Sequence, residues 1–379
     1  MNDKKLDRLI SKSAIVLMTF ILLFPGISGA GMADGHSKFL GNIFTGTVDP
    51  DFSTYWNQVT PGNAGKWVAM EPQRDKMSWK NMDTMFDYAR GRSLPVKQHN
   101  FIWGSAQPVW INSLPSDQQK AEIVEWIFLF CQRYPEKQFI DVVNEPLHDP
   151  PPYKAAIGGD GVTGWDWVIW AFQQARTLCP NSKLLINEFN IEGEYSTMTQ
   201  YISLIQVLKY RGLLDGIGVQ GHSLEDTSSS ELKASLDRLA TLELPIYISE
   251  LDIQGDDDKQ LSIYKQLFPV MWEHPGVYGI TLWGYKQGQM WRPTAYLLRS
   301  DGSERPALSW LRSYLAAKQT KPPKPPFREC IVVGVPLAAH RTNDSQFPEF
   351  LTVRQRRILA STVRVVCVRY SKTEPLFAV

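Results

Sequence analysis

The chain of 379 residues contains only four cysteines, none of them in a C-x-x-C pair or in the Cys/His spacing of a metal site. This scarcity excludes zinc-ribbon and disulfide-scaffold proteins, and we expect neither a bound metal nor another cofactor. Cys131 and Cys179 are compatible with a disulfide in an exported protein and equally with two buried thiols. The spacing does not decide between these two states.

Long apolar runs are also scarce, and the clearest one, residues 14–24, is too short to span a bilayer comfortably. Four basic residues stand before it: Lys4, Lys5, Arg8 and Lys12. Small residues at 28–30 follow it and resemble a cleavage site. Residues 1–30 are therefore predicted to be a signal peptide cleaved near Ala30, and we expect a secreted protein, extracellular or periplasmic, without a stable membrane anchor.

A strong charge of either sign is absent, since the whole chain carries +1. Residues 1–30 carry +2 and residues 321–379 carry +6, which leaves −7 on the part between them. A mildly acidic body argues against nucleic acid as a partner. Residues 321–379 begin with a proline-rich linker and continue as a basic tail, for which we expect little order.

Eight short segments are the expected strands, at residues 42–48, 58–60, 94–98, 139–144, 183–187, 216–220, 246–249 and 278–282, and several of them are dense in Ile, Val and Leu. Helical patterns lie between them. Eight strands alternating with helices over about 280 residues predict an α/β fold of the (β/α)8 TIM-barrel type rather than a doubly wound sheet. Residues 31–320 are therefore interpreted as one catalytic domain.

Two helix starts illustrate the local signals. Residues 116–134 repeat apolar side chains at helical spacing, and Ser116 with Gln119 predicts a capping box at the start. The acidic run 256–258 is conceivable as a metal site, but acidic residues also stabilise the first turn of a helix. We expect the run to mark a helix start.

Two glutamates follow or end buried strands at positions where βα loops build the active face of a barrel. Glu145 follows the fourth expected strand and Glu250 the seventh. Neighbouring strand ends add amide, imidazole and indole groups: His99, Trp103, Asn144, Gln220, His222 and Trp283. Retaining glycosidases need two carboxyl groups about 5 Å apart. Strands four and seven face each other across such a barrel, so the pair predicts a glycoside-cleaving site.

Several motifs occur in a fixed order: residues 57–61, Asn63 with Lys66 and Trp67, His99 with Trp103, residues 141–145, Asn187 with residues 189–193, residues 218–222, 249–253 and 279–284, and Trp291. Together they resemble glycoside hydrolase family 10, the family of endo-β-1,4-xylanases. The resemblance covers about residues 40–317. It implies a retaining endo-β-1,4-xylanase that acts on xylan by double displacement.

The resemblance also implies roles for the reacting groups. Glu145 would be the acid/base, protonated when it assists the leaving oxygen, and Glu250 the ionised nucleophile. Asn144 would hydrogen-bond the sugar 2-hydroxyl in the transition state. No metal or cofactor takes part in this chemistry.

Further residues would position the two glutamates or bind the sugars of the substrate. His222 would hydrogen-bond Glu250 and be oriented by Asp252, and Gln220 would set the hydrogen bonds around Glu145. The reacting sugar would be walled by His99, Trp103 and Trp283, and the next sugar on the non-reducing side held by Asn63, Lys66 and Trp291.

The chain departs from the family at four positions. Gly62 stands where a Glu is usual, Gly104 where a second His is usual, and Ala106 where a Gln is expected, with Gln107 beside it as a possible substitute. Glu188 replaces an Asp. The first three changes lie around the distal glycone pocket and predict altered sugar binding there, with room for a decorated or different sugar.

Other functions stay open. A β-1,4-glucanase or mannanase of the same barrel clan shares both glutamates, although the motifs at Lys66, His99 and Trp283 favour xylan. A catalytically silent carbohydrate-binding barrel would be expected to lack one carboxylate, and both are present. We expect a monomer.

Overall fold

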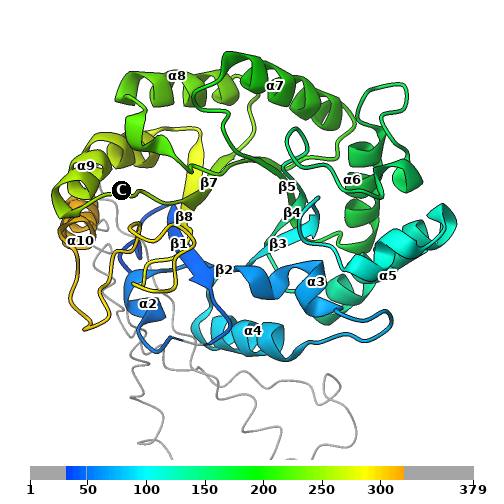
Figure 1. Ribbon diagram of the computed structural model, residues 1–379. Helices are drawn as coiled ribbons and strands as arrows, with labels where there is room; N and C mark the ends of the chain where they lie inside the picture. The colour runs from blue at the N-terminus through cyan, green and yellow to red at the C-terminus, as the bar shows by residue number, and fades with distance from the viewer. Residues whose placement is uncertain (1–30, 48, 320–379) are drawn as a thin grey trace, which may run out of the picture. The chain divides into compact units, whose positions relative to one another are not determined.

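The computed structural model describes residues 31–47 and 49–319. The expected signal peptide, proline-rich linker and basic tail lie outside the described residues. Eight parallel strands form the centre: β1 (Phe39–Phe44), β2 (Val59–Pro61), β3 (Lys97–Ile102), β4 (Phe139–Asn144), β5 (Lys183–Glu188), β6 (Gly216–Val219), β7 (Ile246–Leu251) and β8 (Val277–Leu282). Figure 1 shows them as an inner ring enclosed by helices.

The strands follow one another around the ring in chain order, with β8 paired to β1. Between β2 and β3 the circle is completed by a single parallel bridge from Val59 to Val96. The backbone N–H of Val59 also donates to the carbonyl of Pro95 at 3.0 Å. These contacts make a (β/α)8 barrel, and the fold prediction is confirmed.

The helices of the outer layer separate the strands along the chain. They are α2 (Phe52–Tyr55), α3 (Trp67–Met70), α4 (Lys80–Arg92), α5 (Ser116–Arg133), α6 (Asp166–Leu178), α7 (Tyr195–Tyr210), α8 (Ser229–Ala240), α9 (Asp257–Glu273) and α10 (Pro306–Lys318). Their apolar stripes face the strands. In α5, for example, Ile123, Trp126, Ile127 and Phe130 are fully buried.

The two expected helix starts have different outcomes. Ser116 is the first residue of α5, after Pro115, and no side chain caps the helix, so the capping-box prediction is wrong. A capping box is found instead at the start of α8, between Ser228 and Glu231. Asp256 caps α9 by accepting from the backbone N–H of Lys259 at 2.8 Å, which confirms the acidic run as a helix start.

The strand positions agree closely with the prediction except at two strands. β1 begins at Phe39 and ends at Phe44, and β3 begins at Lys97, three residues later than expected. The start of β3 was predicted too early because the strand begins with three polar residues. These residues, Lys97, Gln98 and His99, are nevertheless almost completely buried in the barrel. A reading based on apolar residues places the strand too early when the strand itself carries a buried polar network.

A disulfide joins Cys131 and Cys179, with the Cα atoms 5.5 Å apart. Cys131 lies near the end of α5 and Cys179 directly follows α6, so the bond ties two neighbouring helices of the outer layer. The structure thus selects one of the two states left open for these cysteines.

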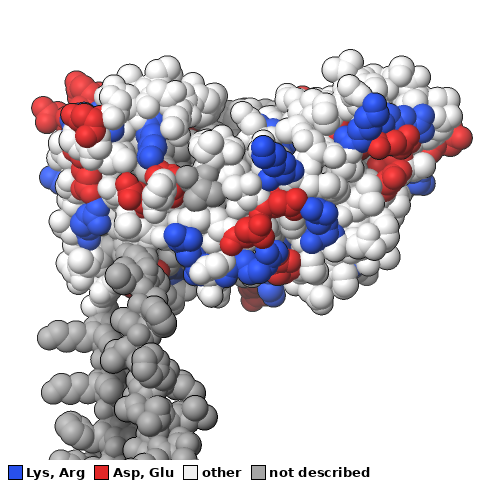
Figure 2. Space-filling model, turned by 90° about the horizontal axis from the view of Figure 1, so that it is seen from below, with Lys and Arg blue, Asp and Glu red and all other residues white. Residues whose placement is uncertain are grey.

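The surface of the described domain carries charges of both signs. On the face shown in Figure 2, basic and acidic residues are interspersed, and the described residues form no extended basic patch there. Within the described ranges, no helix has the length and hydropathy required of a membrane span.

Candidate active site

A cleft of about 870 Å³ lies over the carboxyl ends of the barrel strands. Its lining includes every residue of the expected site except Asp252: Asn63, Lys66, His99, Trp103, Asn144, Glu145, Gln220, His222, Glu250, Trp283 and Trp291. Its volume falls within the range of about 300–1,000 Å³ typical of small-molecule sites. Residues from eight different loops and strands therefore converge as the sequence predicts.

Glu145 follows β4 directly and is half-buried. Its backbone has a φ of 53°, and its N–H donates to the carbonyl of Asn187 on β5 at 2.8 Å. The carboxyl accepts from three donors: Trp103 Nε1 at 3.0 Å, Asn144 Nδ2 at 3.0 Å and Gln220 Nε2 at 2.9 Å. These contacts fix the carboxyl while leaving the group accessible from the cleft.

Glu250 lies within β7 and is only 4% exposed. Its Oε1 accepts from Asn187 Nδ2 at 2.7 Å, and its Oε2 lies 3.3 Å from His222 Nε2. Burial opposes its negative charge, but the imidazoles of His99 and His222 and the ammonium of Lys97 outweigh burial and hold its pKa at about 2. Glu250 is therefore ionised at neutral pH.

His222 is held from its far side by Asp252. Its Nδ1 lies 2.9 Å from Asp252 Oδ1, an ion pair whose geometry is not that of an aligned hydrogen bond. Burial opposes a charge on the ring, but Asp252 and Glu250 raise the pKa of His222 to about 10. Asp252 is anchored in turn by Trp291 Nε1 at 2.7 Å and by Arg292 Nη1 at 2.9 Å.

Asn187 links the two halves of the site. Its Nδ2 donates both to Glu250 Oε1 and, at 2.8 Å, to Asn144 Oδ1, and its Oδ1 accepts from Ser249. The side chain is fully buried. One amide group thereby fixes the spacing between the residue that precedes Glu145 and the carboxylate of Glu250.

His99 is positioned by a buried ion pair between Asp141 and Lys97. Asp141 Oδ2 lies 3.0 Å from His99 Nδ1 and accepts from Lys97 Nζ at 2.8 Å. The rings of His99 and Trp283 pack in a T-shaped arrangement at a centroid distance of 4.9 Å. These contacts place an imidazole and an indole side by side on the cleft wall.

Asn63 and Lys66 lie together on the adjoining wall. Lys66 Nζ donates to Asn63 Oδ1 at 2.9 Å and lies 4.7 Å from the centre of the Trp103 ring. Burial lowers the pKa of Lys66, while Glu250 and Glu145 act in the opposite direction. Trp291, 62% exposed, also lines the cleft and lies next to His222.

The departures from the family pattern have distinct structural settings. Gly62 lines the cleft, and an added Cβ would lie 3.4 Å from Ile43 Cδ1, which is an ordinary contact, so a side chain could be accommodated there. At Gly104 an added Cβ would lie 2.5 Å from the carbonyl oxygen of Asp149, so that space is filled. Gln107 bonds the carbonyl of Gly104 and is outside the cleft lining, so it does not replace the expected glutamine there.

Glu188, the fourth departure, is fully buried beneath the loop that carries Glu145. Its carboxylate accepts from the backbone N–H groups of Leu147 and Phe189, each at 2.9 Å, and lies 2.8 Å from His148 Nδ1. Burial outweighs these donors and raises its pKa to about 7. Glu188 thus anchors the loop after β4 without reaching the cleft.

The site contains functional neighbours that the sequence did not identify. Asn187 was part of a motif but not an expected site residue, and the anchors Arg292 and Lys97 carried no signal of their own. Asn187 stands at a polar strand end, which is the pattern that identified Glu145 and Glu250. That signal was sufficient to include it.

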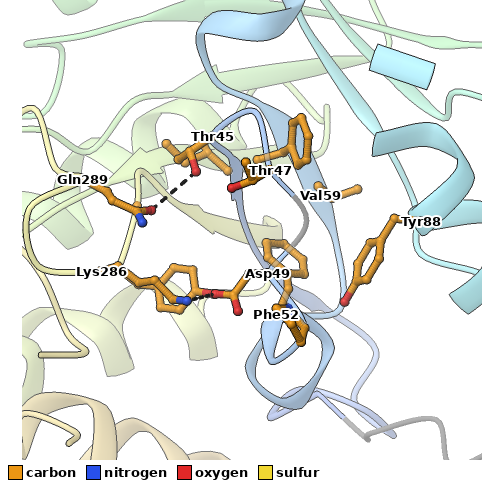
Figure 3. A pocket seen from close by; sticks show the side chains of 13 residues that line it. Thr45, Thr47, Asp49, Phe52, Val59, Tyr88, Lys286 and Gln289 are labelled. Carbon is orange, nitrogen blue, oxygen red and sulfur yellow. Dashed lines mark hydrogen bonds and ion pairs between the residues drawn. The ribbon is translucent and has the colours of Figure 1, made fainter. Parts of the chain in front are cut away.

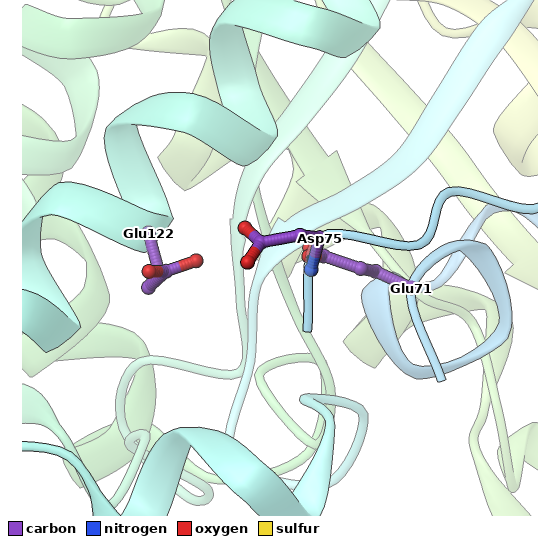
Figure 4. A group of neighbouring side chains, drawn as sticks. All are labelled: Glu71, Asp75 and Glu122. Carbon is purple, nitrogen blue, oxygen red and sulfur yellow. The ribbon is translucent and has the colours of Figure 1, made fainter. Parts of the chain in front are cut away.

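A separate acidic cluster lies outside the cleft (Figure 4). Glu71, Asp75 and Glu122 bring one carboxylate oxygen each within 4.8 Å of the others. Each buried member already has partners, because Glu71 accepts from Trp67 Nε1 at 2.8 Å and Glu122 pairs with Arg74. These contacts account for the cluster as part of the packing between α3 and α5.

Comparisons with known proteins agree with this geometry. Endo-1,4-beta-xylanase B of Cellvibrio japonicus is 40% identical over 280 residues, which is 72% of this chain but 45% of that protein. An endo-1,4-beta-xylanase of Agaricus bisporus is 30% identical over 64% of this chain and 75% of its own length. Among solved structures, a GH10 protein from Paenibacillus barcinonensis is 26% identical with a TM-score of 0.69, covering 77% of this chain and 98% of its own. Residues 28–314 match the model of glycosyl hydrolase family 10, and the chain belongs to that family.

Proposed function

We propose that this chain is a retaining endo-β-1,4-xylanase with Glu145 as acid/base and Glu250 as nucleophile. The observation that carries the proposal is the meeting of these two carboxyl groups in one cleft, in different surroundings. Glu250 is buried beside His99 and His222 and has a pKa of about 2, whereas Glu145 is half-buried and open to the cleft. Different surroundings for two carboxyls are what separate acid from nucleophile.

In the first step the ionised Glu250 attacks the anomeric carbon of the sugar walled by His99, Trp103 and Trp283. The bond from this carbon to the leaving oxygen breaks as Glu145 gives that oxygen its proton. A glycosyl ester on Glu250 and a shortened chain with a free hydroxyl result. Asn144 Nδ2, already directed toward the site, is placed to donate to the sugar 2-hydroxyl as charge develops.

In the second step Glu145, now ionised, takes a proton from a water molecule. The resulting oxygen attacks the anomeric carbon from the side that the first chain vacated, and the bond to Glu250 breaks. Two displacements at one carbon return its original configuration. His222 and Asn187 hold the carboxylate of Glu250 at both oxygens, so the same geometry serves both displacements.

Xylan is the substrate that the wall residues favour. Lys66, His99 and Trp283, whose motifs favour xylan, all line the cleft, and the relatives described above are named endo-1,4-beta-xylanases. A glucanase or mannanase would use the same two glutamates, so the substrate has to be tested directly. A silent binding barrel is disfavoured because both carboxyls are present with their partners.

The test compares linear xylan, cellulose and mannan, and follows the anomeric configuration of fresh products by NMR. We expect hydrolysis of xylan with retention, and a loss of about 10⁴-fold or more in Glu250→Ala because the nucleophile is gone. Glu243→Ala, a change at an 85% exposed glutamate, serves as the matched control. Inversion of configuration, faster hydrolysis of another glycan, or full activity in Glu250→Ala would refute the proposal.

We also propose that the protein is exported and acts as a monomer, with residues 1–30 removed. The basic residues before the apolar run favour export, and the Cys131–Cys179 disulfide favours an oxidising compartment. N-terminal sequencing of the secreted protein is expected to begin near Gly31, and light scattering to give the mass of one chain. An intact N-terminus in the cell fraction, or a dimer mass, would contradict this proposal.

A further inference from the structure

A second cavity of about 250 Å³ adjoins the catalytic cleft (Figure 3). Its walls come from the end of β1 and the segment after it, from the loop after β8, and from α2, β2 and α4. Four residues line both spaces: Ile43, Thr45, Thr47 and Gln289. At this border Thr45 Oγ1 and Gln289 Oε1 are 3.4 Å apart, an exposed and long hydrogen bond that is easily exchanged. We refer to this space as the side cavity.

The neighbours of Gly62 show which part of the cleft the side cavity adjoins. Its neighbours are Ile43 Cδ1 and the carbonyl oxygen of Phe44, each 3.4 Å from where a Cβ would stand, and both residues line the side cavity. Asn63 follows Gly62 directly, Lys66 stands four positions after it, and both line the cleft. The side cavity therefore adjoins the sugar position that Asn63 and Lys66 form, and no side chain at position 62 stands between them.

The size of the side cavity limits its occupant. A volume of about 250 Å³ is below the range of about 300–1,000 Å³ of sites for larger ligands, so it suits one small ring rather than a chain. Rings from Phe52, Tyr88 and Tyr285 form part of the wall, and apolar sugar faces stack on such rings. Thr45, Thr47 and Gln289 add hydroxyl and amide groups at the border.

The charge of the side cavity limits the occupant further. Among its lining residues Lys286 is the only cation and Asp49 the only anion, and the two form an ion pair in which the Tyr285 hydroxyl also contacts Asp49. A negatively charged ligand would have to compete with Asp49 for Lys286 and leave that carboxylate unpaired. A neutral, hydroxylated group meets no such penalty.

We propose that the side cavity binds a neutral single-sugar branch, such as a pentosyl group, carried by the backbone sugar that Asn63 and Lys66 hold. The proposal rests on the proposed function, since the backbone chain must occupy the cleft. Gly62 leaves the border open, and the branch contacts replace the carboxylate that the family usually has at this position.

The test uses xylotetraose in three forms: unbranched, with a neutral pentosyl branch on the non-reducing terminal sugar, and with the same branch on the next sugar. Cleavage at the central linkage, verified by mass spectrometry, places the terminal sugar at the Asn63–Lys66 position. We expect kcat/KM for the terminal branch to equal or exceed that of the unbranched chain. The other branch should react at least about tenfold more slowly, because Trp103 and Trp283 wall that position.

Two variants separate the side cavity from the cleft. Thr47→Trp places a ring at the border, and Gly62→Glu restores the family carboxylate at a backbone position where a side chain fits. Each should lower the ratio of kcat/KM for the terminally branched over the unbranched substrate by about tenfold. Thr177→Trp, the same change on an exposed position of α6, should leave the ratio unchanged.

The outcomes are distinguishable. No cleavage of any xylotetraose refutes the proposed function and with it this inference. Cleavage of the unbranched chain with the terminal branch about tenfold slower or worse overturns the side-cavity proposal alone. A fourth xylotetraose carries a uronyl branch on the terminal sugar, and its cleavage as fast as that of the neutral terminal branch overturns the choice of a neutral ligand. An unchanged ratio in both variants overturns the assignment of the branch to the side cavity.

Discussion

His222 is the residue whose removal most directly tests how the charge on Glu250 is maintained. Its Nε2 lies 3.3 Å from Glu250 Oε2, and Asp252 on its other side helps to raise the pKa of His222 to about 10 despite burial. The ring is thus a cation beside the nucleophile at neutral pH. His222→Ala removes both the hydrogen bond and the charge, whereas His222→Gln removes the charge and leaves an amide.

The expected effect is an upward shift in the pKa of Glu250. A hydrogen bond to a charged group contributes about 1.5–3 kcal/mol, and the 3.3 Å separation places this one near the lower end. One pKa unit corresponds to about 1.4 kcal/mol, so the bond and the lost charge together amount to about one to two units. From about 2, the pKa of Glu250 should reach about 3 to 4 in His222→Ala. His99 Nδ1, 3.9 Å from Oε1, limits the rise.

Because Glu250 acts in its ionised form, activity falls as the pH drops through its pKa, and a higher pKa moves the acidic limb of the profile upward. The measurement is kcat/KM on unbranched xylotetraose from about pH 2.5 to about pH 7 in short incubations. Aliquots returned to neutral pH report any unfolding. We expect a smaller shift in His222→Gln and none in His36→Ala, which removes a histidine outside the cleft. An acidic limb at the wild-type position, with a rate lowered equally at every pH, would show that His222 acts without changing the charge of Glu250.

Three other predictions concern the residues around this centre. Asn187→Ala removes the donor shared by Asn144 and Glu250, and kcat should fall by about 10- to 100-fold with KM less affected; an unchanged kcat in steady-state assays would contradict the linking role. The pKa of Glu188 is about 7 in the folded protein against an ordinary 4.5, so its favourable contribution to stability is complete below pH 4.5 and is lost as the pH rises through 7. The stability of the wild type relative to Glu188→Gln, from urea unfolding, should therefore fall by roughly 2–3 kcal/mol between about pH 4.5 and about pH 8, and a pH-independent difference would refute this. The Cys131–Cys179 disulfide closes a separation of 48 residues, for which chain entropy predicts up to about 4 kcal/mol; unfolding with reductant should show a loss of that order, and no loss would mean that the bond is not formed.

The fold was predictable because most strands follow one simple rule. Strands such as β4, β7 and β8 are dense in Ile, Val and Leu, and the predicted positions lie within two residues of the observed ones. β3 breaks the rule because its side chains include the buried Lys97, Gln98 and His99. The polar network that positions His99 therefore shifted the predicted bounds of β3. The prediction failed at a strand that carries part of the candidate active site.

The two glutamates were predictable because each stands at the end of an apolar strand, where a carboxylate needs a solvated or polar cavity. Their partners across the cleft were only partly predictable. The contact between His222 and Asp252 was expected, but the anchoring of Asp252 by Arg292 depends on the path of the loop after β8. Such loop positions have no periodic signal, and only the family resemblance indicated Trp291 nearby.

The two glycines that depart from the family pattern have opposite meanings, which the sequence alone could not separate. At Gly104 the carbonyl and side chain of Asp149 occupy the space of the missing side chain, and the N–H of Gly104 donates to that carbonyl at 2.9 Å. The loop after β4 therefore packs where the usual histidine would stand, and the loss is compensated within the protein. At Gly62 no such replacement exists, since a side chain there would meet only ordinary contacts with Ile43 and Phe44. A change in substrate preference is consequently to be sought at Gly62 and the adjoining side cavity, where the protein leaves space for the ligand to fill.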